Sequence, residues 1–479
     1  MTIENMIKRI QDITRQDAGI NGDAQRIEQL VWMLFLKIYD AKEEFWEFEE
    51  DDYESIIPEE LKWRNWAIDH KDGEALTGDA LLEFINNQLF PTLKNLEITE
   101  TTPKRSAIVK DIFTDVNNFM KNGVLLRQII NILNEVDFTE YDDRHTFNDV
   151  YETILKDLQS AGNAGEFYTP RPCTDFIVEM LNPQIGEKIA DFACGTGGFL
   201  ISAINHMMDQ VKTTEDMEKL QNGLYGIEKK PLPYLLATTN MILHDIDSPR
   251  IDHDNSLGKS VREYKESDRF DVIIMNPPYG GVEEASIQNN FPVELRTSET
   301  ADLFMALIIY RLKQNGRCGV ILPDGFLFGT DNAKVAIKKN LLEECNLHTI
   351  VRLPGGVFAP YTSISTNILF FDKSGPTQET WFYEHQVGYG TKTYSKTKPI
   401  RYNDFKNERE WWNNREENDV AWKVSMDEII ANNFNLDFKN PAKAQEEALL
   451  SSEEYLGYLK ELIKESNELV QQLEAALKA

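Results

Sequence analysis

The sequence predicts an α/β protein with a Rossmann-like, doubly wound sheet, an all-α N-terminal domain and a C-terminal helix. Three observations support this prediction. Short apolar runs alternate with helical stretches between residues 165 and 440, residues 1–160 show helical periodicity, and the end of the chain carries a heptad stripe. The chain of 479 residues is also too long for one hydrophobic core. We therefore expect domains at residues 1–160, 161–440 and 441–479.

The first of these regions is predicted to be helical. Its segment AQRIEQLVWMLFLKIYDAKEEF is apolar nearly all round, which is typical of a buried helix. The overlapping acidic run AKEEFWEFEEDDYESI is expected to form a solvated face or a loop. Further along, Leu125, Ile129, Ile130 and Leu133 recur at helical spacing. The segment FNDVYETILKDLQSAG then ends at Gly162, a common helix stop.

Strand-like and helix-like segments alternate from residue 165 to about 440. The apolar runs are EKIADFA, GLYGIE, FDVIIMN, GRCGVILP, LHTIVRLP and STNILFFD. Helical segments such as PCTDFIVEML, GFLISAINHMM, LPYLLATTNMILH and TADLFMALIIYRLKQNG lie between them. This alternation predicts a mostly parallel sheet covered by helices. Because parallel crossovers are right-handed, we expect a doubly wound sheet that binds its ligands at the carboxyl ends of its strands.

The chain ends in a segment with heptad periodicity, interrupted at Ser466. Such a helix packs either on its own domain or on a partner, and its length and terminal position favour the partner. The apolar positions of the stripe are Leu456, Leu459, Ile463, Val470, Leu473 and Leu477.

Composition argues against several classes of protein. The longest apolar run, Leu30–Leu36, is too short to cross a bilayer, and the N-terminus lacks the apolar segment of a signal peptide. The cysteines Cys173, Cys194, Cys318 and Cys345 show neither metal nor disulfide spacing, so we expect a reduced, cytoplasmic protein without a metal. The net charge of −30 argues against a chain that binds nucleic acid unaided, unless a basic partner or a local basic strip supplies the contact.

A glycine-rich turn in IADFACGTGGFLISA, residues 189–203, follows a predicted strand and precedes a predicted helix. Its glycines allow a ligand to approach the backbone, but their spacing is neither the dinucleotide fingerprint nor a phosphate loop. Asp191, at the strand end, would repel a pyrophosphate and accept a hydrogen bond from an ammonium group. Glu228, after the next strand, can bind both hydroxyls of a ribose. The two acids favour S-adenosylmethionine as ligand; the alternative is a helix cap and a surface charge.

The run DVIIMNPPYGG, residues 271–281, ends a later strand with the tetrad Asn276-Pro277-Pro278-Tyr279. The prolines stiffen the backbone, so the Asn276 amide oxygen and the Pro277 carbonyl form two fixed acceptors. Two acceptors suit the two hydrogens of an exocyclic amine. By accepting both, they localise the lone pair of the amine and direct it at an electrophile. Tyr279 offers an aromatic face to a flipped-out base. The tetrad therefore predicts methyl transfer to an amine.

The ordered series GEFYTPR, DFACGTGGFL, YGIE, NPPYGG, GRCGVILPDGFLF and RLPGGVFAPYTSISTNILFF resembles the modification subunits of type I restriction–modification systems. The resemblance runs from RIEQLVWMLFLKIYD to the terminal helix. It departs from the family at Phe192, where Pro is common, and at Tyr279, where Phe is often seen. The resemblance implies a site-specific N6-adenine DNA methyltransferase that uses S-adenosyl-L-methionine and acts on double-stranded DNA with the target adenine flipped out.

The same resemblance assigns residues to the site. It implies that GEFYTPR borders the methionine end of the cofactor and that Asn255 or Asp254, in DHDNSL, contacts its adenine ring. It also implies that Phe358, in GGVFAP, helps to hold the flipped base. The expected cofactor-binding residues are Glu166, Phe167, Tyr168, Thr169, Pro170, Arg171, Asp191, Thr196, Gly197, Gly198, Glu228 and Asn255. The expected catalytic residues are Asn276, Pro277, Pro278 and Tyr279.

The residues after about 440 are too few to read a DNA sequence. The resemblance implies that a separate specificity subunit reads it and binds the C-terminal helix, with two copies of this chain per specificity subunit. A nuclease–translocase restriction subunit would complete the restriction enzyme. We expect the isolated chain to methylate little DNA. Methylation of cytosine N4, methylation of an RNA or protein amine, and a non-enzymatic scaffold remain as alternatives, although the motif order favours adenine.

Overall fold

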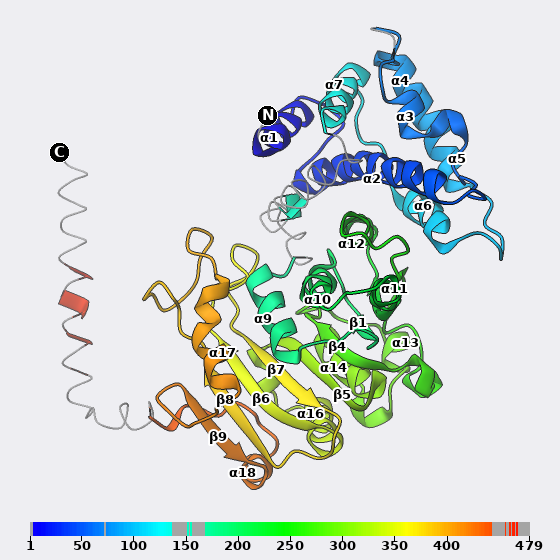
Figure 1. Cartoon of the computed structure of the whole chain (residues 1–479). Helices are drawn as coiled ribbons and strands as arrows, with labels where there is room; N and C mark the ends of the chain where they lie inside the picture. The colour runs from blue at the N-terminus through cyan, green and yellow to red at the C-terminus, as the bar shows by residue number, and fades with distance from the viewer. Residues whose placement is uncertain are drawn as a thin grey trace.

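The computed structural model describes residues 3–70, 73–136, 151–152, 154–155, 168–442, 456, 459–460, 462–464 and 466–467. Figure 1 shows a helical N-terminal part next to a part built on a large sheet. None of the helices in the described ranges is both long enough and apolar enough to span a bilayer. Most of the segment predicted as a helix ending at Gly162, apart from residues 151–152 and 154–155, and most of the terminal heptad segment lie outside the described residues.

The N-terminal part is organised around α2 (Asp23–Glu49). Trp32, Phe35 and Tyr39 of this helix are completely buried, as predicted for a helix that is apolar nearly all round. The predicted helical spacing near residue 130 also corresponds to a helix, α7. The elements that surround α2 are α1 (Ile3–Thr14), η1 (Glu59–Leu61), α3 (Trp63–Trp66), α4 (Gly78–Phe84), η2 (Ile85–Leu89), α5 (Phe90–Lys94), α6 (Lys104–Asp115) and α7 (Gly123–Asn134).

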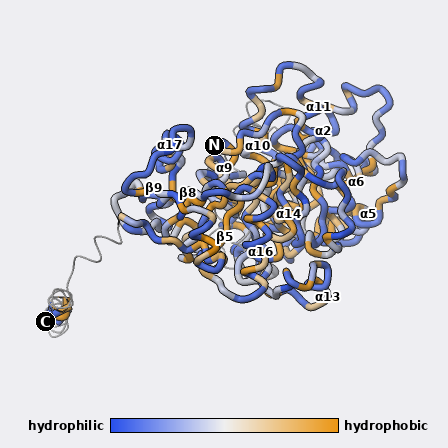
Figure 2. The backbone as a smooth tube through the Cα atoms, turned by 90° about the horizontal axis from the view of Figure 1, so that it is seen from below, coloured by the Kyte–Doolittle hydropathy of each residue, from blue (hydrophilic) through white to orange (hydrophobic). Residues whose placement is uncertain are grey.

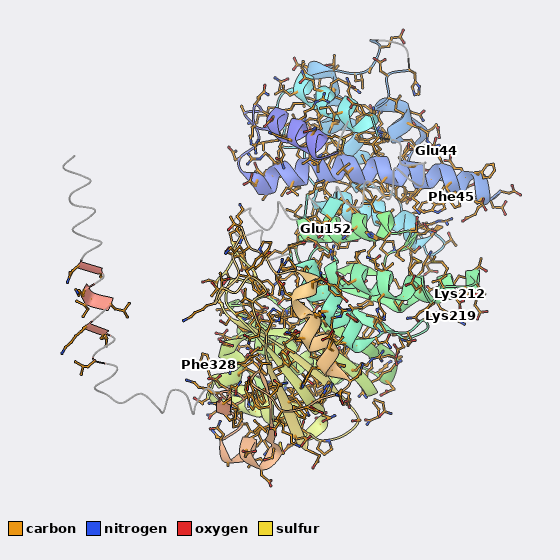
Figure 3. All side chains as sticks on the ribbon, turned by 60° about the vertical axis from the view of Figure 1, so that its left-hand side comes forward. Glu44, Phe45, Glu152, Lys212, Lys219 and Phe328 are labelled. Carbon is orange, nitrogen blue, oxygen red and sulfur yellow. The ribbon has the colours of Figure 1, made fainter. Side chains whose placement is uncertain are left out.

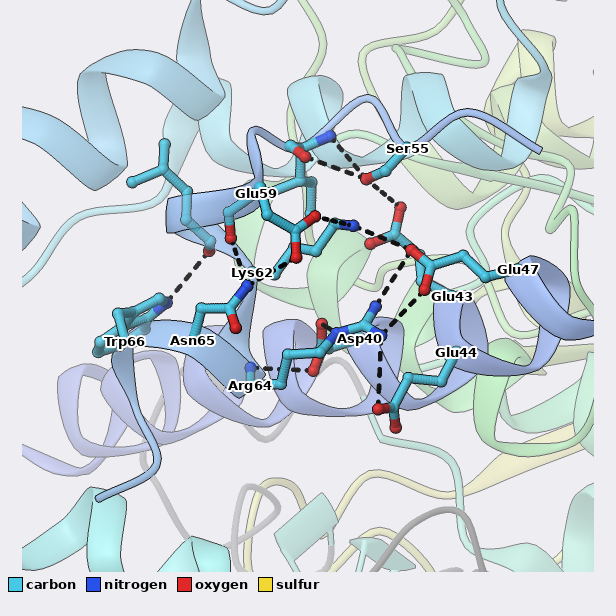
Figure 4. Close-up of polar contacts among 12 residues, drawn as sticks. Asp40, Glu43, Glu44, Glu47, Ser55, Glu59, Lys62, Arg64, Asn65 and Trp66 are labelled. Carbon is cyan, nitrogen blue, oxygen red and sulfur yellow. Dashed lines mark hydrogen bonds and ion pairs between the residues drawn. The ribbon is translucent and has the colours of Figure 1, made fainter. Parts of the chain in front are cut away.

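The acidic run is predicted to form a solvated face or a loop; its first half continues α2 and exposes three of its four acids, as a solvated face does, but it also carries buried residues. Glu43 and Trp46 are buried, and the Glu43 carboxylate accepts a hydrogen bond from Ser55 Oγ at 2.6 Å. The chain after α2 folds back over the helix and brings cations to its acids (Figure 4). Lys62 Nζ lies 2.9 Å from Glu47, and the Arg64 side chain also binds Glu47. The buried Glu43 is thus hydrogen-bonded by a hydroxyl group, and the two cations pair with the exposed Glu47.

The second part contains a nine-stranded sheet with the order β3-β2-β1-β4-β5-β7-β6-β8-β9 within the described residues. Its register places Ile189 opposite both Leu224 and Val272, so β1 lies in the middle of the parallel region. The strands are β1 (Ile189–Asp191), β2 (Leu224–Glu228), β3 (Ile251–His253), β4 (Phe270–Met275), β5 (Leu312–Pro323), β6 (Asn346–Leu353), β7 (Thr366–Asp372), β8 (Glu379–Glu384) and β9 (Ala421–Ser425).

The sheet is mixed rather than wholly parallel. Strands β3, β2, β1, β4 and β5 pair in parallel, as predicted. Strand β7 is antiparallel to both β5 and β6, and β9 is antiparallel to β8. β7 pairs directly with the preceding β6 because the 354–365 connection carries no crossover helix. Since β8 is parallel to β6, the carboxyl ends of β1, β2, β4, β5, β6 and β8 share one edge, called here the carboxyl edge.

Two hydrophobic cores lie on the two faces of the sheet. On one face pack α9 (Arg171–Leu181), α10 (Gly198–Met208) and α12 (Pro231–Leu243); on the other pack α14 (Thr300–Arg311) and α16 (Asn332–Glu344). Figure 2 shows apolar segments along β5 and near α9 and α14. The remaining helices are α11 (Thr214–Gly223), η4 (Val261–Glu263), η5 (Glu266–Asp268), α13 (Ala285–Gln288), η6 (Val293–Leu295), α15 (Asp324–Phe328), η7 (Tyr402–Phe405), α17 (Lys406–Trp412) and α18 (Met426–Ala431).

The helical part docks on the sheet-containing part through α2 and α12. Lys42 Nζ on α2 lies 2.7 Å from Asp245 and 3.4 Å from Asp247, just after α12. The hydroxyl of Tyr151 donates to the Leu236 carbonyl at 2.8 Å. These polar contacts accompany the packing of α2 against α12, whose residues from Pro233 to Leu243 are all buried.

Candidate functional site

A cavity of about 360 Å³ opens at the carboxyl edge, beside β1, β2 and β4. Its walls come from the glycine loop after β1, the end of β2, the loop after β3 and the tetrad after β4, together with one residue that precedes α9. A volume of this size falls within the range of small-molecule sites. The predicted residues in its wall are Thr169, Asp191, Thr196, Gly198, Glu228, Asn255, Asn276, Pro278 and Tyr279.

The glycine loop takes a path that other residues would disfavour. Gly195 and Gly197 have φ values of 54° and 79°, in the left-handed region. A Cβ on Gly198 would lie 2.8 Å from Nη1 of Arg171, so this position also has little room for a side chain. Asn240 of α12 donates to the Thr196 carbonyl at 3.0 Å and fixes the turn from behind. The loop therefore presents bare backbone to the cavity.

Two buried carboxyl groups stand at the ends of β1 and β2. Asp191 accepts a hydrogen bond from the Ala193 amide at 3.0 Å, and Glu228 accepts from the amides of Gly195 and Lys230 at 3.0 and 2.8 Å. Asp191 does not cap α10 and Glu228 is only 7% exposed, so the interpretation as a helix cap and a surface charge is wrong. Burial raises the pKa of Asp191 well above its ordinary value and that of Glu228 to about 7.

This donor set fits a ligand that carries hydroxyl groups and a positive charge. Each carboxylate oxygen has two lone-pair directions, so Glu228 retains acceptor capacity beyond its two backbone contacts. A cation placed beside Asp191 and Glu228 would also relieve the cost of burying two acids together. The glycine loop between them leaves space for the body of such a ligand.

The tetrad forms an internally bonded unit at the end of β4. The Tyr279 hydroxyl donates to Oδ1 of Asn276, and the amide nitrogen of Asn276 donates to Thr169 Oγ1 at 3.1 Å. These two contacts fix both ends of the amide. The side-chain oxygen of Asn276 keeps a second lone pair available to a substrate.

An aromatic corner stands beside the tetrad. The ring of Tyr279 meets the ring of Phe358 edge to face, with centroids 6.2 Å apart. Phe358 is buried and lies in the 354–365 loop between β6 and β7. Burial of the Tyr279 hydroxyl, and to a lesser degree Cys173 and Tyr361, raises its pKa well above the ordinary value, so the phenol is a neutral donor.

The loop after β3 forms another wall. Oδ1 of Asn255 accepts from the Leu257 amide at 3.1 Å, and Asp254 accepts from the Asn255 amide at 2.7 Å. Ser256 donates to the Phe192 carbonyl at 2.5 Å, which ties this loop to the glycine loop. Asp254 and Asn255 both line the cavity.

Several predicted site residues lie outside the cavity wall. The Tyr168 hydroxyl donates to Glu152 at 2.6 Å, and Arg171 Nε donates to the same carboxylate at 2.8 Å. Both side chains thus bind the segment before α9. The other predicted residues that are not in the wall are Pro170, Gly197 and Pro277, while Glu166 and Phe167 fall outside the described residues.

The cavity also contains residues that the sequence did not single out. Lys229 and Lys230 line it, and their position directly after Glu228 was the only available signal. Glu283 and Thr300 form a further wall, joined by a hydrogen bond of 3.2 Å. No motif marks these two residues, because the fold brings them to the site from separate segments.

The fold and the site together define an α/β methyltransferase that acts on an exocyclic amine. Comparison with known proteins specifies the family. The N-6 DNA methylase family matches residues 142–449, and the HsdM N-terminal domain family matches residues 3–133. The chain is 57% identical over 454 residues to the type I restriction enzyme EcoEI methylase subunit of Escherichia coli, covering 93% of this chain and 91% of that one.

Solved structures agree with this assignment. A modification subunit of a proposed type I restriction enzyme from Vibrio vulnificus YJ016 is 42% identical, with a TM-score of 0.81 over 92% of this chain and 97% of that one. A chain from a study of complex assembly and conformational transition in a type I restriction–modification system is 37% identical, with a TM-score of 0.82 over 99% and 98%. The chain therefore belongs to the N-6 DNA methylase family and is a methylase subunit of a type I restriction–modification system. The predicted enzyme class, an adenine-specific N6 DNA methyltransferase, is confirmed.

Proposed function

We propose that the cavity at the carboxyl edge binds S-adenosyl-L-methionine and that the tetrad presents the N6 amine of a flipped-out adenine in double-stranded DNA to it. One observation supports this proposal above all. The structure brings the two buried acids, Asp191 and Glu228, into the same cavity as the amide of Asn276. The acids that would bind a ribose and a cation therefore lie next to the amide that would accept a hydrogen bond from an amine.

The cofactor, when bound, supplies an electrophilic methyl group. Glu228 would accept hydrogen bonds from its ribose hydroxyls and Asp191 from its ammonium group. Thr169, Thr196, Gly198 and Asn255 are the other predicted residues in the wall that would enclose it.

The protein's own contribution is to hold the amine in a reactive orientation. Oδ1 of Asn276 is fixed by the Tyr279 hydroxyl and would accept one amine hydrogen, while the Pro277 carbonyl would accept the other. Accepting both hydrogens raises the electron density on nitrogen as the new bond forms. The corner formed by Tyr279 and Phe358 would stack against the extruded base.

The chain would act within a larger assembly. The domains would be residues 1–160, 161–440 and 441–479, and the last would bind a specificity subunit that carries two copies of this chain and recruits a restriction subunit. In its support, the described residues Leu456, Leu459, Leu462 and Ile463 have helical backbone and are each more than half exposed. The net charge of −30 also favours a partner that holds the DNA. The four cysteines are free and buried, which suits a reduced, cytoplasmic location.

Titration calorimetry of S-adenosylmethionine tests the cofactor assignment. The wild-type chain and Asn276→Ala should bind with similar affinity, whereas Glu228→Ala should lose binding. Methyl transfer to duplex DNA, measured with the specificity subunit present, should then be absent in Asn276→Ala. Full binding by Glu228→Ala, or undiminished methylation by Asn276→Ala, would contradict the proposal.

A further inference from the structure

One segment of this acidic protein is strongly basic. Residues 386–401, QVGYGTKTYSKTKPIR, contain Lys392, Lys396, Lys398 and Arg401 but no Asp or Glu, although the chain as a whole has 80 acidic and 50 basic residues. All four cationic side chains are exposed. This stretch, called here the basic segment, connects β8 to η7 and α17.

Three of these charges are available to a ligand. Arg401 binds Asp404 at 2.7 Å and stacks over Tyr389 at 4.2 Å. By contrast, Lys392, Lys396 and Lys398 make no ion pair with a carboxylate of the described residues. In the cavity that Lys392 borders, Asp437 and Asp324 lie 2.7 and 3.8 Å from Arg352, which offsets their charge.

Topology places the basic segment at the carboxyl edge of the sheet. It follows β8, which is parallel to β6, so it leaves the sheet at the carboxyl edge together with the tetrad and the glycine loop. Figure 1 shows the loops after β6 and β8 projecting from the sheet on the same side, to the left of α9.

A buried network holds the basic segment in place. Tyr394, in its middle, is only 3% exposed, and its hydroxyl lies 2.7 Å from His385 Nε2 and 3.2 Å from Asp404. Nδ1 of His385 in turn lies 2.7 Å from Glu408. Lys392 and Lys396 lie two residues to either side of this tyrosine, so the backbone that carries them is held close to an anchored residue.

The same tyrosine joins the basic segment to the loop beside the tetrad. The Tyr394 amide donates to the Gly355 carbonyl at 3.1 Å. Gly356 has a φ of 84°, and a Cβ there would lie 2.2 Å from the Tyr394 carbonyl oxygen. The backbone of the 354–365 loop and the backbone of the basic segment are therefore in close contact. Two residues further on, Phe358 packs against Tyr279. The basic segment is thus braced against the loop that would hold the flipped base.

We infer that Lys392, Lys396 and Lys398 bind phosphate groups of the substrate DNA next to the flipped-out adenine. The inference rests on the proposed role of the tetrad. Ammonium groups bind phosphates without reading sequence, so such contacts would set the position of the duplex and leave site selection to another subunit. The three lysines would also explain how a chain of net charge −30 approaches DNA at the carboxyl edge of its sheet.

The test compares two triple variants in the enzyme assembled with its specificity subunit. One is Lys392→Ala/Lys396→Ala/Lys398→Ala. The other, Lys212→Ala/Lys219→Ala/Lys339→Ala, removes the same charge from exposed lysines elsewhere, two of which are labelled in Figure 3. Affinity for a duplex with the target site is measured at several salt concentrations, together with methylation, cofactor affinity and assembly by size-exclusion chromatography.

The first variant should bind DNA at least about tenfold more weakly, and the negative slope of log K against log salt should decrease in magnitude by about 2 to 3, since each phosphate contact contributes about 0.9. Cofactor affinity should not change, and the second variant should behave like wild type. An equal loss of DNA affinity in both variants, or an unchanged DNA affinity in the first variant, would overturn the inference. Methylation by the wild-type enzyme would in that case still support the proposed function. Loss of assembly in the first variant would also overturn it, by showing that the segment binds a protein. Failure of wild type to bind cofactor or methylate DNA would instead contradict the proposed function.

Discussion

The hydroxyl of Tyr279 donates a hydrogen bond to the side-chain oxygen of Asn276, three residues earlier in the same tetrad. Since Thr169 receives a hydrogen bond from the Asn276 amide nitrogen, the amide is fixed at both ends before any substrate arrives. An acceptor that is already aligned needs no reorganisation when the amine enters. The tyrosine thus makes a polar contact that a phenylalanine cannot make, in addition to carrying the ring that is proposed to stack against the base.

Tyr279→Phe should separate these two contributions. The ring remains, so affinity for DNA should change little, while loss of the hydrogen bond, worth about 1 kcal/mol, should slow methyl transfer about fivefold. Single-turnover methylation by the assembled enzyme measures the rate. Tyr279→Ala, which also removes the ring, should weaken base extrusion as reported by 2-aminopurine fluorescence at the target position. If Tyr279→Phe and Tyr279→Ala reduced both base extrusion and the methylation rate to the same degree, the separation between the roles of the ring and the hydroxyl would be contradicted.

Cofactor binding should strengthen with pH through Glu228. Burial raises its pKa to about 7, so the free protein holds a proton there below this pH. A cationic ligand favours the ionised form, so binding should release protons and tighten between pH 6 and pH 8. Calorimetry in buffers of different ionisation enthalpy measures this release. Glu228→Gln should bind more weakly and with less pH dependence; an unchanged pH profile would rule out Glu228 as the group responsible.

The same group should affect the stability of the protein without cofactor. The folded-state pKa lies above the ordinary value of 4.5, so the native state binds more protons than the unfolded state between pH 4.5 and about 7. The free energy of unfolding should therefore fall as pH rises through this window. Urea unfolding of wild type and Glu228→Gln at pH 5 and pH 8 tests the sign. The variant should lose less stability than wild type over this interval, and Asp191, whose pKa is shifted in the same direction, should account for part of the remainder.

Gly197→Ala should impair the cofactor site through backbone strain. The φ of 79° at this position disfavours any side chain and costs of the order of 1–2 kcal/mol. Because its neighbours Thr196 and Gly198 line the cavity, both stability and cofactor affinity should decrease. Gly186→Ala is the matched control, since Gly186 has a φ of 93° but lies away from the cavity wall. The control should lose similar stability in thermal unfolding and bind S-adenosylmethionine normally. Equal loss of cofactor affinity in both variants would point to a general folding defect.

Lys42→Met should loosen the contact between α2 and α12. The ammonium group lies near Asp245 and Asp247, which are partly exposed, so its removal should cost only about 1 kcal/mol of unfolding free energy. Because the pairs are accessible to ions, the difference from wild type should shrink at high salt. Urea unfolding at two salt concentrations checks this prediction. A salt-independent loss would indicate that packing of the lysine stem, rather than charge, is responsible.

Elements whose pattern is local could be predicted from the sequence. Several features are encoded within a few consecutive residues. They are the α2 helix with apolar residues on nearly all sides, the glycine turn, the stiff tetrad, and the apolar runs of β1, β2, β4, β5, β6 and β7. Hydrophobic periodicity and turn chemistry act over that range, so these features could be predicted. The family could be predicted in the same way, because the order of the motifs is itself a property of the linear chain.

Features that depend on contacts between distant segments are set by the folded structure and could not be predicted. Nothing local predicted the short strand β3, the antiparallel β7 or the burial of Glu43, since each depends on neighbours that the fold supplies. The sequence also could not predict which side chains point into the cavity. Arg171, expected beside the cofactor, donates to Glu152 and is not part of the cavity wall, whereas Glu283 and Thr300 reach the cavity without any motif. A side chain's partners depend on which segments pack around it, and a linear pattern does not contain that information.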